Sequence, residues 1–427
     1  MGIENCYYEI VEQFNKIDTH IAELNTQRDR WEQVKEDINC VYKKIVPLLQ
    51  NQSKNLESLT ESILNSKYYS REIYHNWEVI AKSLFGSSLA FKLIQYDNIS
   101  MDEARKILTF FENGQLTNEV KACGIFAVAQ SQKVADPMFC YLNSMKAFMI
   151  CNNLGEILGI NYRYDESRLN NMTFDKCPIC GSNNSKPLYC ALQANTVGED
   201  NRFAPVKLWM KCSDCTNIYA YNFPVTDMKY INGHYTRSNN EKRIDPRYHL
   251  SIYNPIFEKI KELTPGNKYL EIGIGNGEML AIALEWGYEV TAVEVCREDC
   301  ENVSAALDVD IRWCDFLEYE SDEKYDVIIM GDVLEHVSKP VKALQKAVGM
   351  LKDEGVLWIS TPNYNSAYAR MQKWQHCMWH EKNHFTFFSY EGLVPILDSL
   401  NLEVKQYRIS DRFIGSMELF VVKKNVK

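Results

Sequence analysis

The chain has 427 residues, of which 46% are hydrophobic and 24% are charged, and its net charge is −10. This composition is that of a globular protein and excludes a disordered chain, while the length predicts roughly two to four domains. No apolar run reaches the roughly 18 residues of a membrane-spanning helix. The negative charge argues against a nucleic-acid partner, because phosphate binding requires a basic surface.

The amino terminus, M-G-I-E-N-C-Y-Y-E, has neither the basic segment nor the apolar segment of a secretory signal, so we expect a cytoplasmic protein. In a large cytoplasmic chain, 14 cysteines indicate free thiols and a metal site rather than a disulfide framework. The acidic balance favours small-molecule, glycan or protein substrates.

Residues 1–67 carry apolar side chains with a seven-residue period on two tracks, which is typical of a coiled coil. Arg28 and Lys35 interrupt the second track, and Pro47 should kink or end the helix. Two interpretations remain open: a coiled coil that joins two copies into a homodimer, or a long helix that folds back on its own neighbours. Amphipathic segments predict a helical domain over residues 68–170, where no motif indicates chemistry.

Two cysteine pairs, C-P-I-C-G and K-C-S-D-C, mark a different domain over residues 171–230. The four cysteines are Cys177, Cys180, Cys212 and Cys215. With 31 residues between the pairs, this spacing is typical of a zinc ribbon with four thiolate ligands. Because four thiolates leave no open coordination position, we expect a structural zinc ion. Gly181 suits the turn of the first pair, whereas the second pair has Thr216 at that position.

Helices and strands alternate from about residue 250 onward, which predicts an α/β fold with a parallel sheet covered by helices on both faces. The predicted strands are 268–273, 289–295, 309–314, 325–330 and 355–360, and the main predicted helices are 252–263, 278–285 and 340–351. The last two predicted strands, 403–410 and 416–423, follow each other without a helix between them. They predict a closing antiparallel pair.

The first strand ends in Y-L-E-I-G-I-G-N-G, with Glu271, Gly273, Gly275 and Gly277 at alternating positions. A dinucleotide fingerprint would need its third glycine at position 278, which is Glu278. The stretch instead resembles motif I of class I S-adenosylmethionine-dependent methyltransferases. The segments E-V-T-A-V-E-V, W-C-D-F, Y-D-V-I-I-M-G-D-V-L-E-H-V and G-V-L-W-I-S-T-P-N follow in the order of that family.

This resemblance implies a Rossmann-like methyltransferase domain over residues 231–427 that binds S-adenosylmethionine. The glycines would lie under the methionine part of the cofactor, and Glu294 would accept hydrogen bonds from the ribose hydroxyls. Asp315 would accept from the adenine amino group, with Phe316 beside the ring. The expected cofactor-binding residues are Glu271, Gly273, Gly275, Gly277, Glu294, Asp315, Phe316 and Asp332.

Three histidines are candidates for the general base that a hydroxyl acceptor requires. His336 lies in L-E-H-V, directly after the fourth predicted strand, where a purely structural role is the alternative. His380 and His384 lie in H-E-K-N-H-F, which resembles a segment that faces the pocket in related enzymes. Histidines at these positions are also candidate metal ligands. Between ribbon and core, the segment with His234 and Arg243 is either a lid over the cofactor or a basic linker.

A zinc ribbon before such a core resembles a group of bacterial sugar and small-molecule methyltransferases. The resemblance implies methyl transfer to a hydroxyl or carbon of a sugar, a glycan precursor or a small metabolite. Two alternatives remain open: a protein or RNA methyltransferase that uses the ribbon and helices to grip its substrate, and a non-catalytic scaffold with a methyltransferase-like module.

Overall fold

The computed structural model describes residues 100–113, 118–158, 160–169, 171–194, 202–224 and 246–424. The chain divides into two compact units, Met1–Asn171 with Pro187–Leu208 (unit 1) and Met172–Lys186 with Trp209–Lys427 (unit 2). The heptad pattern of residues 1–67 and the segment with His234 and Arg243 lie outside the described residues. None of the described helices combines the length and the apolar character that crossing a membrane requires.

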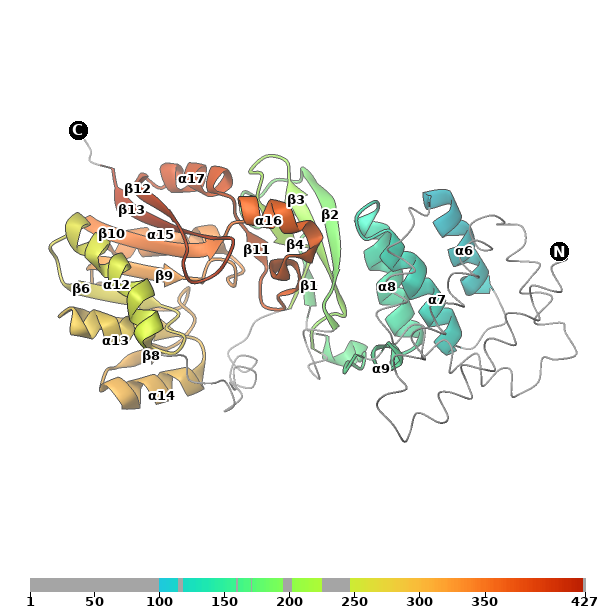
Figure 1. Ribbon diagram of the computed structural model, residues 1–427, viewed down its shortest axis with the longest axis horizontal. Helices are drawn as coiled ribbons and strands as arrows, with labels where there is room; N and C mark the ends of the chain where they lie inside the picture. Colours follow the sequence, from blue (N-terminus) through green and yellow to red (C-terminus); the bar gives the residue numbers. More distant parts are fainter. Residues whose placement is uncertain are drawn as a thin grey trace, which may run out of the picture. The chain divides into compact units, whose positions relative to one another are not determined.

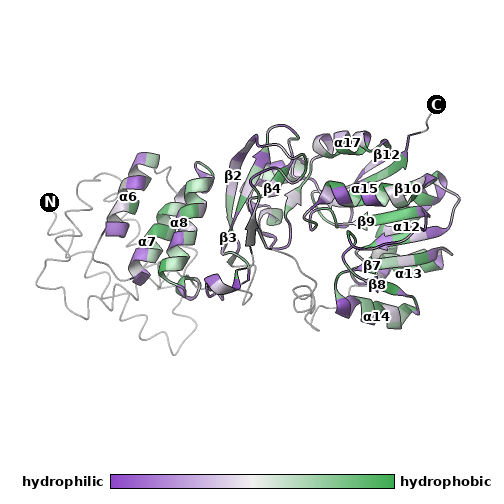
Figure 2. Cartoon of the chain, turned by 180° about the vertical axis from the view of Figure 1, so that it is seen from behind, coloured by the Kyte–Doolittle hydropathy of each residue, from purple (hydrophilic) through white to green (hydrophobic). Residues whose placement is uncertain are grey.

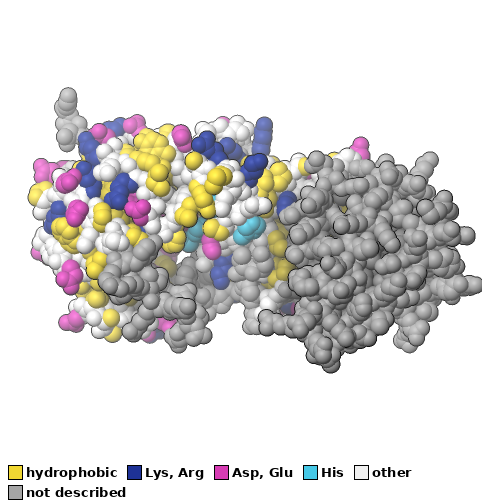
Figure 3. Space-filling view, viewed as in Figure 1, with side chains coloured by type: hydrophobic (Ala, Val, Ile, Leu, Met, Phe, Trp, Pro, Cys, Tyr) yellow, Lys and Arg dark blue, Asp and Glu magenta, His cyan; other side chains and the backbone are white. Residues whose placement is uncertain are grey.

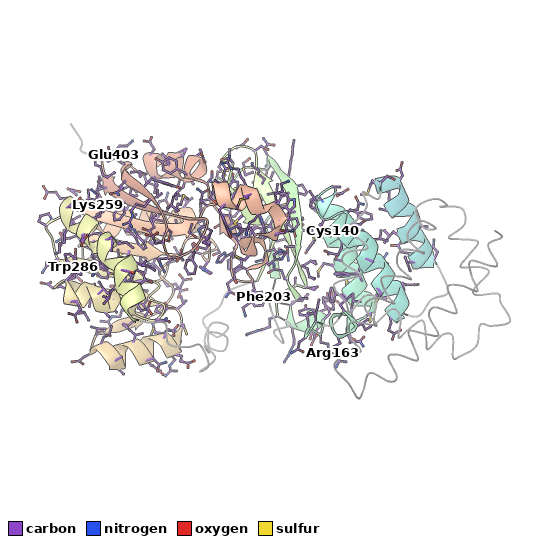
Figure 4. The ribbon with its side chains drawn as sticks, viewed as in Figure 1. Cys140, Arg163, Phe203, Lys259, Trp286 and Glu403 are labelled. Carbon is purple, nitrogen blue, oxygen red and sulfur yellow. The ribbon has the colours of Figure 1, made fainter. Side chains whose placement is uncertain are left out.

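The described part of unit 1 is mainly helical. Its helices are α6 (Met101–Asn113), α7 (Asn118–Ser131), α8 (Pro137–Ile150) and α9 (Leu154–Ile157), followed by the 3-10 helix η2 (Glu166–Arg168). Helix α8 begins at Pro137 because Asp136 caps it by accepting a hydrogen bond from the Phe139 amide at 3.0 Å. The buried rings of Phe126 and Tyr162 meet Phe148 edge to face, with centroids 5.7 and 5.6 Å away. Figure 4 shows Cys140 on α8.

A small four-stranded sheet has the strand order β11-β4-β3-β2. Its strands are β2 (Ser185–Leu192), β3 (Val206–Cys212), β4 (Ile218–Ala220) and β11 (Thr386–Phe387), and a separate pair consists of β1 (Asn171–Thr173) and β5 (Asn222–Pro224). Strand β4 is antiparallel to β3 and also to β11, with Tyr219 opposite Thr386. Strand β4 therefore lies between a strand from its own region of the sequence and one from the carboxy-terminal third.

The large sheet of unit 2 has seven strands in the order β12-β13-β10-β9-β6-β7-β8. They are β6 (Lys268–Ile272), β7 (Glu289–Glu294), β8 (Ile311–Trp313), β9 (Tyr325–Gly331), β10 (Leu351–Pro362), β12 (Leu402–Ile409) and β13 (Ser416–Lys423). Neighbouring strands from β8 to β10 are parallel, whereas β13 is antiparallel to both β10 and β12. The predicted α/β fold and its antiparallel closing pair are confirmed (Figure 1).

Burial along the strands explains their sequences. The central strand β9 is buried at most positions, as expected for a parallel strand with helices on both faces. The edge strand β12 alternates between less and more exposed residues, because one of its faces meets solvent. In the hydropathy colouring of Figure 2, the central strands are mainly hydrophobic, whereas the helices of this unit carry both hydrophilic and hydrophobic residues.

Helices cover both faces of this sheet. They are α12 (Pro246–Leu263), α13 (Glu278–Glu285), α14 (Arg297–Leu307), α15 (Pro340–Met350) and α17 (Tyr390–Ser399). The short helix α16 (Ala367–Gln372) and the 3-10 helices η3 (Lys373–Gln375) and η4 (Cys377–His380) lie between β10 and β11 in the chain. Phe257 on α12 stacks on Trp286 and Tyr269, with centroid distances of 6.4 and 6.1 Å. Figure 4 labels this tryptophan, which joins α12 to the end of α13.

Two departures from the predicted elements have physical reasons. The predicted helix at 340–351 ends one residue early, because Leu351 already pairs with Tyr325 and begins β10. Helix α17 was not predicted, since Gly392 and Pro395 are poor helix formers. Its Ser389 cap accepts a hydrogen bond from the Gly392 amide at 3.0 Å and starts the helix in spite of them.

Candidate functional site

A cavity of about 1090 Å³ opens at the carboxyl ends of the parallel strands of unit 2. It lies where the strand order reverses between β6 and β9, which is the usual ligand position in open α/β sheets. Ligand sites commonly measure about 300–1,000 Å³, so the volume of this cavity is at the upper end of that range. The space-filling view of Figure 3 shows histidine side chains at the surface of this unit.

The glycine loop between β6 and α13 requires its glycines. Gly273, Gly275 and Gly277 have φ angles of +75°, +53° and +77°, in the left-handed region. A Cβ atom at Gly277 would lie 2.4 Å from Val303, and one at Gly273 would lie 2.9 Å from Val333. Gly273 and Gly275 line the cavity, whereas Gly277 is not among its lining residues and makes room for Val303.

Glu294 at the end of β7 holds the glycine loop in place. One carboxylate oxygen accepts from the Ile274 amide at 2.9 Å, and the other accepts from the amides of Val295 and Cys296 at 2.8 and 2.7 Å. Burial raises the pKa of Glu294, and these amides oppose the shift. Because a carboxylate offers about four acceptor positions, three amides leave one for a ligand hydroxyl.

Asp315 and Phe316 follow β8 and line the same end of the cavity. One Asp315 oxygen accepts from the Leu317 amide at 2.8 Å, which fixes the carboxylate against the loop. The Phe316 ring is buried, and the Lys346 ammonium lies 5.4 Å from its centroid. A polar acceptor beside a fixed ring surface suits a flat heteroaromatic ligand group.

Glu271 lies at the base of the cavity and is 3% exposed. Its carboxyl accepts a hydrogen bond from the Tyr269 hydroxyl at 2.8 Å. Burial raises the pKa of Glu271 to about 8, so the group is mostly protonated at neutral pH.

Asp332, which follows β9, has a φ angle of +55°, in a region that non-glycine residues seldom adopt. Two contacts to Ser360 hold it there: the Asp332 amide donates to the Ser360 carbonyl at 2.8 Å, and the Ser360 hydroxyl donates to Oδ1 at 2.9 Å. Its Oδ2 forms an ion pair with Nη2 of Arg412 at 3.0 Å. Such local strain is typical of functional sites.

The other half of the cavity contains His336 and His384. Their ring centroids lie 4.6 Å apart with an interplanar angle of 82°. Nδ1 of His336 lies 3.1 Å from the Asn383 carbonyl oxygen, which can only accept, so Nδ1 carries the proton and Nε2 keeps its lone pair. This nitrogen is a candidate base.

Glu335 lies beside the two histidines and is 1% exposed. Its Oε2 accepts from the Thr361 hydroxyl at 2.9 Å, and burial together with the neighbouring Asp332 raises its pKa well above the ordinary value. Ligand atoms of Glu335, His336 and His384 lie within 4.8 Å of one another, so these side chains could also hold a divalent cation.

His380 and His376 differ in their position relative to the cavity. His380, in η4, lies with Nε2 3.4 Å from the Trp374 carbonyl oxygen and is not among the residues that line the cavity. His376 lines it, although sequence reasoning did not select this residue. Its Nδ1 accepts from the Met378 amide at 3.2 Å, and burial lowers its pKa. Sequence reasoning also missed Arg412, whose only signal was a basic residue between two predicted strands.

The four predicted cysteine ligands converge in unit 2. Sγ of Cys177 lies 3.7 Å from that of Cys215, and Sγ of Cys180 lies 3.6 Å from that of Cys212. Thiolates around a tetrahedral zinc ion, with Zn–S bonds of about 2.3 Å, lie about 3.8 Å apart. The arrangement therefore fits zinc.

The turns after the two cysteine pairs have the same backbone conformation. Gly181 has a φ angle of +76°, and Thr216, at the equivalent position of the second pair, has +62°. This conformation is strained for a β-branched residue. The Tyr364 hydroxyl donates to the Thr216 carbonyl at 2.6 Å and helps to hold the turn.

The residues around the four cysteines, here called the cysteine region, pack against the segment that carries His384. Trp209 lies 4.6 Å from the Phe387 ring, and Phe387 lies 5.5 Å from the His384 ring, measured between centroids. The Trp209 indole also donates to the Trp379 carbonyl at 3.0 Å. Together with the pairing of β4 and β11, these contacts tie the position of His384 to the cysteine region.

Comparisons with known proteins find similarity in the region that contains the large sheet. Residues 244–407 match the family model described as a methyltransferase domain. The ubiquinone biosynthesis O-methyltransferase of Actinobacillus pleuropneumoniae serotype 7 (strain AP76) is 31% identical over 109 residues, which cover 23% of this chain and 47% of that protein. The enzyme of the same name from Xanthomonas campestris pv. campestris (strain B100) is 26% identical over 132 residues, covering 29% and 55%. The chain spans about half the length of the curated relatives that it matches.

Solved structures of methyltransferases align with part of this chain at low identity. An S-adenosylmethionine-dependent methyltransferase from Clostridium acetobutylicum ATCC 824 aligns with a TM-score of 0.34 and 14% identity over 43% of this chain and 94% of that one. Magnesium protoporphyrin IX methyltransferase from Synechocystis PCC 6803 aligns with a TM-score of 0.36 and 15% identity over 46% and 92%. The family match and the strand order confirm the predicted class I methyltransferase fold. The cysteine region lies outside the residues that the family model matches.

Proposed function

We propose that this chain, whose residues 244–407 are a methyltransferase domain, transfers a methyl group from S-adenosylmethionine to a hydroxyl group of a small molecule. One observation carries the proposal: a single cavity joins the glycine loop and Glu294 at one end to His336 and His384 at the other. A methyl donor and its acceptor need such a shared space, because the transfer is an in-line displacement between them.

The cofactor half would bind through the residues that the sequence predicted. Glu294 would accept from a ribose hydroxyl while it holds the Ile274 amide, and Asp315 and Phe316 would receive the adenine ring. S-adenosylmethionine supplies an electrophilic methyl group on a positively charged sulfur. The acidic side chains around this cavity suit that charge.

The acceptor half would remove the proton of the attacking hydroxyl. Nε2 of His336 is its proton acceptor, because the Asn383 carbonyl already holds the opposite nitrogen. His384, with its ring edge-on to His336, borders the acceptor. The curated relatives are named for O-methylation, which supports a hydroxyl over a carbon acceptor.

A divalent cation is a second candidate for activating the acceptor. It would be held by Glu335, His336 and His384, whose ligand atoms lie within 4.8 Å of one another. Such an ion lowers the pKa of a bound hydroxyl and would replace the histidine base. Activity that survives extensive treatment with EDTA would favour the histidine base.

We also infer that the four cysteines hold a structural zinc ion. The Sγ separations of 3.6 and 3.7 Å support this, since they are close to those of a tetrahedral thiolate site. The ion would stabilise the region that packs against Phe387 and thereby the position of His384.

The proposal is tested by calorimetric titration of the full chain with S-adenosylhomocysteine, together with Glu294→Ala. We expect binding by the original protein and a loss of at least tenfold in affinity for the variant. Labelled S-adenosylmethionine is then offered with a panel of small hydroxylated acceptors that includes phenols and nucleotide sugars. A folded protein that does not bind S-adenosylhomocysteine contradicts the proposal. Labelling of protein or RNA alone would instead favour a macromolecular substrate.

A further inference from the structure

Arg412 is a largely buried cation that lines the cavity and has no role in the proposed function. It lies in the turn between β12 and β13, and its side chain is 15% exposed. The guanidinium packs over the rings of Tyr253, Trp358 and Phe413, with centroid distances of 5.5, 5.8 and 5.7 Å. Among the described residues that line the cavity, it is the one Lys or Arg.

The ion pair with Asp332 and the interaction with the Tyr253 side chain use only part of this guanidinium. Nη2 lies 3.0 Å from Oδ2 of Asp332, whereas Nε and Nη1 are buried without a hydrogen-bond partner. Oδ2 of Asp332 likewise accepts no hydrogen bond of good geometry. Buried charged groups are usually hydrogen-bonded in native proteins, so these atoms are available to a polar ligand group in the cavity.

Other acidic groups near Arg412 do not replace such a ligand. Burial raises the pKa of Glu271 to about 8, and burial also raises the pKa of Glu418. Burial therefore favours the protonated form of both groups, whereas Arg412 and Asp332 have opposite charges and form an ion pair at 3.0 Å. A ligand that carries a carboxylate next to an ammonium group would complement this pair on both sides.

The position of the pair agrees with such a ligand. Strand β9, which ends at Gly331, is paired with β6, whose end begins the glycine loop. A Cβ atom at Gly331 would lie 2.8 Å from Nη1 of Arg412, so glycine at this position makes room for the guanidinium. The groups expected to bind adenosine lie on the other side of the loop, after β7 and β8.

We propose that Arg412 and Asp332 bind the amino-acid end of S-adenosylmethionine, with its carboxylate on Arg412 and its ammonium group on Asp332. The inference rests on the proposed function, because it assumes that this cofactor occupies the cavity. It assigns a cofactor-binding role to a residue in the carboxy-terminal hairpin, far from the glycine motif in sequence.

Two ligands test the inference directly. S-adenosylhomocysteine has the amino-acid end, and 5′-methylthioadenosine has the same nucleoside and thioether without it. We expect Arg412→Gln to bind S-adenosylhomocysteine about 10- to 100-fold more weakly, because charge-assisted hydrogen bonds are lost. Its affinity for 5′-methylthioadenosine should change by less than about threefold. Both affinities are measured by calorimetry on the full chain.

Asp332→Asn is a second variant that avoids a folding defect, because asparagine tolerates the left-handed conformation of this position. It should show the same selective loss. Lys405→Gln is the matched control, since Lys405 lies on the same hairpin and pairs with Glu403 at the surface, and it should change neither affinity.

An equal loss of both affinities in Arg412→Gln and Asp332→Asn would overturn the inference and give the pair a structural role. Unchanged affinity for S-adenosylhomocysteine would overturn it as well. If the original protein binds 5′-methylthioadenosine as tightly as S-adenosylhomocysteine, the amino-acid end has no site here. If it binds neither, the proposed function itself fails, together with this inference.

Discussion

The two halves of the cavity are built in different ways. The part of the proposed cofactor half that would hold the adenosine comes from one stretch of chain, in which Glu294 ties its own strand end to the glycine loop. The acceptor half combines His336, after β9, with His384. The His384 ring packs on Phe387, which in turn packs on Trp209 of the cysteine region. The difference teaches that the proposed adenosine site depends on local backbone geometry, whereas the proposed acceptor site depends on the packing of distant segments.

The sharpest way to separate the halves is to remove the proposed base. We expect His336→Gln to lower kcat about 10²- to 10⁴-fold, because the acceptor hydroxyl loses its proton acceptor. The affinity for S-adenosylhomocysteine should stay within about twofold of the original, since His336 is not in the cofactor half. Steady-state kinetics and calorimetry measure the two quantities. His380→Gln is the control, and a variant with full activity at His336 would exclude it as the base.

Removal of the proposed zinc ion should also affect the acceptor half more than the cofactor half. Structural zinc sites contribute about 10–16 kcal/mol of binding free energy, so the cysteine region should lose its structure in a strong chelator. We expect methyl transfer to fall at least tenfold while S-adenosylhomocysteine still binds. Metal content, activity and affinity are followed together. Full activity in zinc-free protein would show that the acceptor half does not depend on the ion.

Glu271, in the cofactor half, should make the free energy of unfolding depend on pH. Burial raises its folded pKa to about 8, above the ordinary value of 4.5. The folded state therefore binds more protons than the unfolded state between these values, and the free energy of unfolding falls as pH rises through this range. The total change is on the order of a few kcal/mol, since one pKa unit corresponds to about 1.4 kcal/mol.

Glu271→Gln should remove this dependence, because glutamine can still accept from the Tyr269 hydroxyl without titrating. Chemical denaturation at pH values from about 5 to about 9, in steps of about one pH unit, measures the difference in free energy of unfolding between the two proteins. The variant should gain stability relative to the original as pH rises. Parallel curves for the two proteins would contradict the raised pKa.

The smallest effect concerns the two cysteine turns. Thr216→Gly should raise the free energy of unfolding by about 0.5–1 kcal/mol, because glycine relieves the left-handed strain at this position. Gly181→Ala is the opposite test: a Cβ atom there meets no atom within 4 Å, so any loss reports the backbone conformation alone. Denaturant midpoints of the zinc-loaded protein measure both. A destabilised Thr216→Gly would mean that threonine contacts outweigh the strain.

The elements that could be predicted are those whose signals are local. Helix α13 occupies the residues predicted for it, since its glycine turn marks its start, and β13 also matches its prediction. Helix α17 was missed because its cap overcomes two poor helix formers. Strand β11 has only two residues, and it exists because β4 offers a partner across the fold.

The sequence alone determined the glycine loop, the acid at Glu294, the four cysteines and the alternation of helices and strands. Each of these depends on conformational limits of single residues or on short spacings, which neighbours along the chain carry. Only the tertiary structure decided that Arg412 lies against Asp332, that His336 faces His384, and that His376 rather than His380 lines the cavity. These pairs depend on how the strand ends and the hairpin pack together, and that packing brings together residues whose separation along the chain carries no signal.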